Sequence, residues 1–186
     1  FDSISDTKNS QGIVLITEKP ITGKNQIEKN LSSKPLLLLL HKLNNPSNLG
    51  AILRTAEAVG VVGVITTKGT TDVFSAKALR GAMGANLRIP FWTNAEFSEA
   101  IIWAKSIGLK SICADIRGQK SYIEIDWNIP RMLIVGSEGH GLTEDERNLT
   151  DESLIIPMNN GVESLNVAVA CGIILFETKR QRELNP

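Results

Sequence analysis

The sequence predicts an α/β fold in which a mostly parallel sheet is flanked by helices. From Pro35 onward, short apolar runs alternate with helical patterns. The runs are apolar at consecutive positions, which is typical of strands covered on both faces, and such strands belong to parallel sheets. Three of the runs end in elbows rich in Gly and Asn. Because parallel strands end at one edge of a sheet, we expect a ligand site at that edge.

The predicted elements follow one another along the chain. The strands are expected at Leu36–Leu40, Val61–Thr66, Leu109–Ala114, Met132–Val135 and Leu154–Ile156. The helices are expected at Asn48–Val59, Ser75–Met83, Ala95–Ile107 and Ser164–Lys179. A further short helix is expected after Thr143, because Thr143 and Glu146 have the spacing of a capping box.

The chain of 186 residues, 42% of them apolar, is long enough for one well-filled domain. We place this domain at residues 34–186. The preceding residues 1–33 are polar apart from the strand-like Gly12–Thr17, and they read as one element plus a linker. Because the chain starts at Phe1 without an initiator Met, we expect an N-terminal truncation.

Composition narrows the class of protein. The longest apolar run, Leu36–Leu40, is too short to span a bilayer, and there is no signal peptide pattern, so we expect a cytoplasmic protein with no membrane partner. Cys113 and Cys171 lie in apolar runs, which indicates buried reduced thiols. No metal site is expected, because His and Cys do not cluster at ligand spacing. Twenty basic residues balance twenty acidic ones, so any nucleic-acid surface must be local.

The first elbow, NNPSNLGAILRTAEAVG, leads from the strand at Leu36 into a helix. Asn48 opens that helix in the prediction, and it has two readings of about equal weight: an N-cap, or a contact with substrate. Arg54 falls nearly opposite the apolar face of the helix, since successive residues turn by about 100°. Taken alone, such a position favours a solvated arginine.

The second elbow, in LIVGSEGHGL, predicts a tight turn. Gly136, Gly139 and Gly141 allow positive φ or close approach of a ligand to backbone, and Glu138 is carried outward at the strand's end. The glycines do not match the G-x-G-x-x-G pattern, which disfavours a nicotinamide enzyme. His140 has no partner signature and is interpreted as part of the turn.

The third segment, LIIPMNNGVESLNVAVACG, leads into a helix that is apolar on nearly every face. Such a helix must be enclosed, and one small domain cannot surround many helices, so we predict a homodimer with this helix at the interface. Ser164 is the expected N-cap. Asn166 is the one amide in the first turns, where burial requires hydrogen bonds.

Together and in order, these segments resemble the three motifs of the SpoU/TrmH family of RNA ribose 2′-O-methyltransferases, within the SPOUT superfamily. The resemblance runs from about Leu36 to Glu177. It implies a C-terminal trefoil knot and S-adenosyl-L-methionine as cofactor. It also implies that residues 1–33, which include the stretch SQGIVLI, are the remnant of an upstream RNA-binding domain.

The resemblance also implies which residues form the site. Arg54 matches the motif arginine that is implicated in activating the ribose hydroxyl near the dimer interface. Because a guanidinium normally keeps its proton, binding a phosphate and orienting the hydroxyl is more favourable for it than acting as a general base. The pocket would be built by Asn48, Glu138, Ser164 and Asn166. The cofactor would be held by backbone groups of Gly136, Ile156 and Leu165, with Met158 packing nearby. Five basic residues outside the motifs have two interpretations, contact with phosphates or simple solvation. They are Lys77, Arg80, Arg88, Arg117 and Lys120.

The function implied is methyl transfer from S-adenosylmethionine to a ribose 2′-hydroxyl of structured RNA, with ribosomal RNA favoured over transfer RNA. Two alternatives stay open at this point. One is a non-catalytic RNA-binding module that retains the fold, and the other is a base methyltransferase of the same superfamily.

Overall fold

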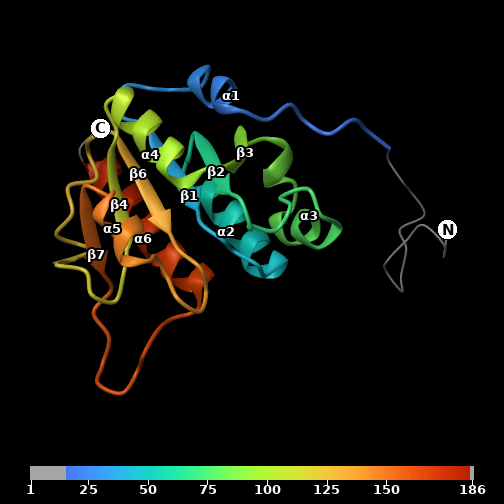
Figure 1. The fold of residues 1–186 in the computed structure, drawn as a ribbon. Coiled ribbons are helices and arrows are strands. Elements are labelled where there is room, and N and C mark those ends of the chain that lie inside the picture. The colour runs from blue at the N-terminus through green and yellow to red at the C-terminus, as the bar shows by residue number, and fades with distance from the viewer. Residues whose placement is uncertain (1–15, 185–186) are drawn as a thin grey trace.

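The computed structural model describes residues 16–184, and they form one parallel sheet covered by helices (Figure 1). The sheet has seven strands in the order β3-β2-β1-β6-β4-β7-β5. Every strand pair in it is parallel. The strands are β1 Leu36–Leu40, β2 Gly63–Thr67, β3 Phe91–Ala95, β4 Lys110–Ala114, β5 Lys120–Ser121, β6 Arg131–Val135 and β7 Glu152–Ile155. The predicted α/β class is confirmed.

Helices cover both faces of the sheet. They are α1 Lys24–Glu28, α2 Pro46–Ala58, α3 Ala76–Ala82, α4 Phe97–Ser106, α5 Glu144–Asn148 and α6 Val167–Leu184. Successive residues of β1 point to opposite faces: Leu36, Leu38 and Leu40 pack with α2, α3 and α6, whereas Leu37 and Leu39 pack with α1 and α4. Strand β1 is buried along its whole length, which explains its five consecutive leucines.

The predicted strands and helices match the structure to within one to three residues at most boundaries. Two strands were not predicted, and both lie at the edges of the sheet. β5 has two residues, and β3 has polar residues at Thr93 and Asn94. The short length of β5 and the polar residues of β3 leave neither strand with the continuous apolar run that revealed the central strands.

The segment predicted as a linker contains α1, which packs on the domain. Ile27 is fully buried, and Glu28 accepts a hydrogen bond of 2.8 Å from Trp103 Nε1. The strand expected at Gly12–Thr17 lies mostly outside the described residues, and the remaining Ile16 and Thr17 are not in a strand. Among the helices of the described part, none is long and apolar enough to cross a membrane.

Helix α6 packs on α2 with one face only. Cys171, Ile174 and Leu175 are fully buried, whereas Val169 and Phe176 are 52% and 54% exposed. Both cysteines of the chain are free and buried, as predicted, and burial raises the pKa of Cys171 to about 12. A strip of apolar side chains on α6 is thus left uncovered by this single chain.

Candidate active site

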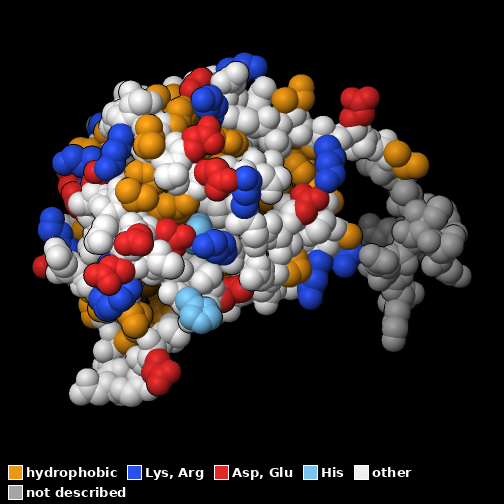
Figure 2. Space-filling model, in the orientation of Figure 1, with side chains coloured by type: hydrophobic (Ala, Val, Ile, Leu, Met, Phe, Trp, Pro, Cys, Tyr) orange, Lys and Arg blue, Asp and Glu red, His pale blue; other side chains and the backbone are white. Residues whose placement is uncertain are grey.

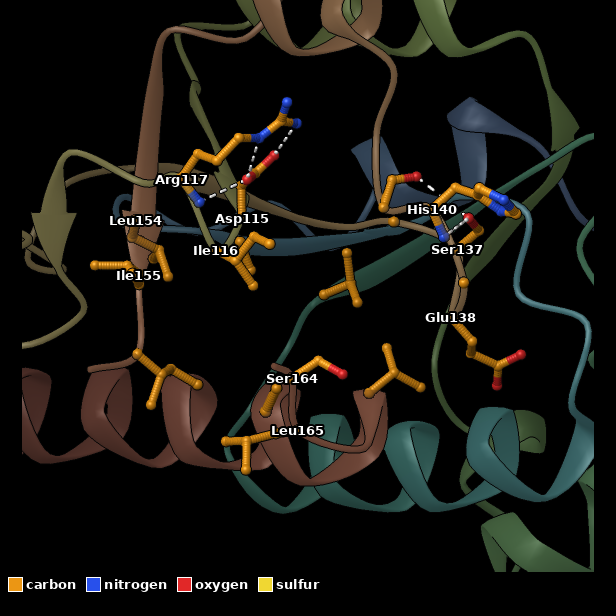
Figure 3. Close-up of a pocket in the computed structure, with 18 of the residues that line it drawn as sticks. Asp115, Ile116, Arg117, Ser137, Glu138, His140, Leu154, Ile155, Ser164 and Leu165 are labelled. Atoms are coloured by element: carbon orange, nitrogen blue, oxygen red, sulfur yellow. Dashed lines mark hydrogen bonds and ion pairs between the residues drawn. The ribbon is translucent and has the colours of Figure 1, made fainter. Parts of the chain in front are cut away.

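An open cleft of about 460 Å³ lies at the carboxyl edge of the sheet. Its walls come from the segments that follow β4, β6 and β7 and from the chain that enters α6 (Figure 3). In Figure 1 the connection from β7 to α6 projects away from the body of the molecule beside this edge. The walls are residues 114–117, 135–141, 154–156, 158, 164–165, 167 and 170. The elbows predicted to bind a ligand after β6 and β7 therefore meet in one place.

The turn after β6 requires glycine at its first position. Ser137 and Gly141 form an antiparallel bridge that closes the turn, and Gly141 has a φ of 61°. A Cβ on Gly136 would lie 2.6 Å from the carbonyl carbon of Gly141, which is closer than real Cβ atoms approach backbone. Glycine at 136 thus allows a tight turn, which carries Glu138 outward as predicted.

A chain of hydrogen bonds joins the three motifs. Asn48 Nδ2 donates to Glu138 Oε1 at 2.6 Å, and Asn166 Nδ2 donates to Asn48 Oδ1 at 3.2 Å. Asn166 Oδ1 accepts from the backbone N–H groups of Ala168 and Val169 at 2.9 and 3.3 Å. Because an N–H group can only donate, the start of α6 fixes the orientation of the Asn166 amide, and through it that of Asn48. Glu138 is the acceptor at the end of this chain.

The structure corrects the predicted N-caps. Asn45, not Asn48, caps α2, with Pro46 at the first helical position, where a missing N–H costs nothing. Asn166, not Ser164, caps α6, which begins at Val167. Ser164 instead stays outside the helix and lines the cleft. The cap reading of Asn48 is thus wrong, and its side chain is available for the bond to Glu138.

The predicted site residues fall into two groups. The four predicted to hold the cofactor, Gly136, Ile156, Met158 and Leu165, all line the cleft, as Ser164 and Glu138 do. The other three do not line it. Asn48 and Asn166 lie next to it through their bonds to each other and to Glu138, and Arg54 is exposed on α2. Within residues 16–184, Arg54 has no ion-pair or hydrogen-bond partner.

One wall of the cleft was not predicted as part of the site. It is formed by Asp115, Ile116 and Arg117, directly after β4. Arg117 donates to Asp115 from its backbone and its guanidinium, and these bonds hold the pKa of the Asp115 carboxyl below its ordinary value. In Figure 3 Ile116 extends toward the side of the cleft formed by Leu165, whereas Arg117 extends away from it. The signal in the sequence was the position of these residues at a strand's carboxyl end.

His140 also lines the cleft, although its sequence gave it no role. Its backbone N–H donates to Ser137 Oγ at 3.4 Å, and its side chain is exposed. In the part of the chain that the structure describes, no three His, Cys, Asp or Glu side chains are grouped so that they could hold a metal ion.

Comparison with known proteins decides the family. The model of the SpoU rRNA Methylase family matches residues 35–176. The chain belongs to this family. The match spans the sheet from β1 to most of α6, so it includes every wall of the cleft and the whole hydrogen-bonded chain.

Several relatives within the SpoU family are named as methyltransferases. The chain is 34% identical over 186 residues to a 23S rRNA (guanosine-2′-O-)-methyltransferase RlmB of Neisseria meningitidis, covering 99% of this chain and 74% of that protein. It is 31% identical over 179 residues to the 23S rRNA (guanosine(2553)-2′-O)-methyltransferase RlmP of Bacillus subtilis, covering 96% and 69%. The crystal structure of the SpoU methyltransferase AviRb from Streptomyces viridochromogenes with AdoMet superposes with a TM-score of 0.83 at 29% identity, covering 89% and 67%.

The cleft of this SpoU protein fits an adenosyl group by its chemistry. Its walls combine apolar side chains such as Ile156, Met158 and Leu165 with the backbone of Gly136. Adenine needs a flat apolar slot with backbone donors and acceptors rather than charges. Among the charged side chains that line the cleft, Asp115 and Arg117 form an ion pair with each other, and Glu138 accepts a hydrogen bond from Asn48.

Proposed function

We propose that this protein transfers a methyl group from S-adenosyl-L-methionine to a ribose 2′-hydroxyl of structured RNA, with ribosomal RNA as the substrate class. One observation carries the proposal: the cleft and the Glu138–Asn48–Asn166 chain share the turn Gly136–Leu142. This arrangement puts a polar, oriented array directly beside a pocket that fits the cofactor. The activities of the relatives RlmB and RlmP, both guanosine 2′-O-methyltransferases of 23S rRNA, support the same reaction.

The cofactor supplies a methyl group on a positively charged sulfur, which a nucleophilic oxygen can attack directly. The protein's own task is to bind, orient and exclude water. Gly136, Ile156, Met158 and Leu165 would hold the adenosyl part in the cleft. Glu138 and Asn48 would fix the shape of the cleft's edge where the ribose enters, because their side chains are held by hydrogen bonds.

Arg54 has a separate part in this proposal. Its guanidinium is exposed and unpaired within the described residues, so it is available to a phosphate or a ribose hydroxyl. A guanidinium keeps its proton under ordinary conditions, so orienting the hydroxyl through the neighbouring phosphate is the favoured role.

The exposed strip on α6 supports a homodimer. Val169 and Phe176 are seven residues apart, two turns along the same side of the helix, and both are about half exposed. A second copy of the chain would cover them, and the family resemblance places Arg54 near that interface. The trefoil knot and an upstream RNA-binding domain are also proposals, and both rest on the family resemblance.

The proposed binding of RNA does not depend on a net positive charge of the chain. On the face shown in Figure 2, Lys and Arg side chains are interspersed with Asp and Glu, and the chain has no net charge. Contacts with phosphate would therefore be few and local. Free, buried cysteines fit the reducing compartment, the cytoplasm, in which we place the reaction.

Isothermal titration with S-adenosylmethionine tests the first step. Binding with one site per chain is expected, and it should be weakened by changes in the cleft. Absence of binding would favour the non-catalytic alternative. Mapping of ribose methylation in total RNA, from cells with and without the gene, then identifies the RNA and the nucleotide.

A further inference from the structure

His41 lies at the carboxyl edge of the sheet, beside the turn that carries Glu138, and it begins the loop that leads to α2 and Asn48. It follows β1 directly, and only 2% of the residue is exposed. Its backbone N–H donates to Val135 O at 2.9 Å, at the last residue of the neighbouring strand β6. Gly136, the first residue of the turn with Glu138, comes next. His41 is thus tied to the start of the Gly136–Leu142 turn.

The side chain of His41 reaches the other end of the same turn. His41 Nε2 lies 3.0 Å from Glu146 Oε1. Glu146 Oε2 accepts from the backbone N–H of Thr143 at 2.9 Å, in the capping box of α5. Thr143 directly follows Leu142, the last residue of the turn. Through Glu146, His41 therefore contacts the chain at both ends of the turn.

The protonation of His41 follows from its neighbours. His41 Nε2 faces the Glu146 carboxylate, which can only accept, so in the neutral ring the proton lies on Nε2. Nδ1 then accepts from the Thr67 hydroxyl at 3.0 Å, while Thr67 Oγ1 accepts from the backbone N–H of Lys42 at 3.2 Å. Burial lowers the pKa of His41, with opposing effects from the two charged groups that face it, Glu146 and Lys42. The ring of Phe97 packs edge-on against the imidazole.

Glu146 is ionised at neutral pH. Burial raises its pKa, but hydrogen bonds from Thr143 and Lys42 outweigh this effect and lower it to about 2. The contact with His41 Nε2 has an ion-pair distance without the angle of a hydrogen bond. A buried donor without a well-aligned acceptor destabilises the folded state, and an apolar side chain would avoid this cost. Stability alone therefore does not account for histidine at this position.

We propose that His41 is a positioning residue for methyl transfer: by fastening both ends of the Gly136–Leu142 turn, it holds Glu138 at hydrogen-bond distance from Asn48. His41 is also the first residue of the loop that leads to α2, so it positions both partners of the hydrogen bond between Asn48 and Glu138. This inference rests on the proposed function, and it assigns His41 no contact with the substrate.

The test compares variants at position 41. His41→Leu removes both polar contacts of the ring, whereas His41→Gln offers one acceptor to Thr67 and one donor to Glu146. Lys42→Ala is the matched control, because it removes the other partner of the same Glu146 oxygen, at 3.1 Å, and leaves His41 in place. Two quantities are measured: kcat at saturating cofactor and RNA, and deuterium exchange of the Ser137 and Gly141 amides, which close the turn.

We expect His41→Leu to lower kcat by about tenfold or more, since a misplacement on the order of 1 Å can cost about 100-fold. Exchange of the Ser137 and Gly141 amides should accelerate, while that of β1 and β6 stays as in the unmodified protein. His41→Gln should restore both quantities in large part, and Lys42→Ala should change neither. If His41→Leu does not fold, Glu146→Gln removes the charge that faces His41 while its amide oxygen can still accept from Thr143, and the same two changes are expected.

The proposal is overturned if His41→Leu keeps full kcat and full protection of the turn. It is also overturned if His41→Leu and His41→Gln lose activity equally while exchange rises evenly over the sheet, since that pattern is general destabilisation. If the unmodified protein transfers no methyl group, the proposed function fails, and exchange alone still decides whether His41 holds the turn.

Discussion

The two sides of the Gly136–Leu142 turn differ in chemistry. On one side the turn faces the cleft, whose walls are largely apolar side chains and backbone. On the other side Glu138, which also lines the cleft, accepts from Asn48 of α2, and Asn48 in turn accepts from Asn166. In the proposed function, this difference assigns cofactor binding and positioning of the ribose hydroxyl to different sides of one short segment. Substitutions on the cleft side should therefore change the Kd for S-adenosylmethionine, and substitutions on the α2 side should change kcat.

The largest effect is expected from Arg54→Ala, on the α2 side. It should lower kcat by about 100-fold or more, which is typical when a group that stabilises or orients the reacting atoms is lost. The Kd for S-adenosylmethionine, measured by titration, should be nearly unchanged, because Arg54 does not line the cleft. Lys110→Ala, at the opposite edge of the sheet, is the control. Equal losses of turnover and affinity would contradict the role given to Arg54.

On the cleft side, Gly136→Ala should raise the Kd for S-adenosylmethionine by about tenfold, or about 1.4 kcal/mol. The new Cβ would collide with the backbone of Gly141, so the turn must shift. Gly139→Ala is the matched control in the same turn, since a Cβ there meets nothing within 4 Å. Similar Kd values for the two variants would show that the close approach at Gly136 does not shape the site.

The hydrogen-bonded chain should behave as a unit. Asn48→Ala and Glu138→Ala should each lower kcat by about tenfold, and the double variant should lose little more, because contacting residues are not additive. Initial-rate measurements on the four proteins give the coupling directly. Additive losses in the double variant would mean that the two side chains act independently.

The smallest effect concerns stability. Asn166→Ala should lower the free energy of unfolding by about 1 kcal/mol, the usual cost of losing an N-cap, whereas Ser164→Ala should leave it within about 0.5 kcal/mol. Denaturant titrations of both variants check this. A larger loss in Ser164→Ala than in Asn166→Ala would contradict the position of the cap.

Most of the fold could be predicted from the sequence, because its central strands are buried on both faces. Leu36–Leu40 shows this directly, since its residues supply both layers of core. β3 and β5 were missed because edge strands are short or partly polar. Helix α1 was missed because five residues with one buried side chain, Ile27, leave almost no periodic pattern.

The site could be predicted only where it is local in sequence. The turn with Gly136 and Glu138 follows from its glycines alone. The bond from Asn48 to Glu138 joins residues 90 positions apart, and that from Asn166 to Asn48 joins residues 118 apart, so no local spacing reveals them. The N-caps were misplaced because Asn45, Asn48, Ser164 and Asn166 are all good capping residues, and only the backbone decides among them.

One measurement tests the central claim most directly. The protein is incubated with ribosomal RNA and S-adenosylmethionine labelled in its methyl group, and the RNA is digested to nucleosides that are separated by mass. We predict that the label appears in a 2′-O-methylated nucleoside and is lost with Arg54→Ala. Label on a nucleobase, or none in RNA under conditions where the cofactor binds, would contradict the account.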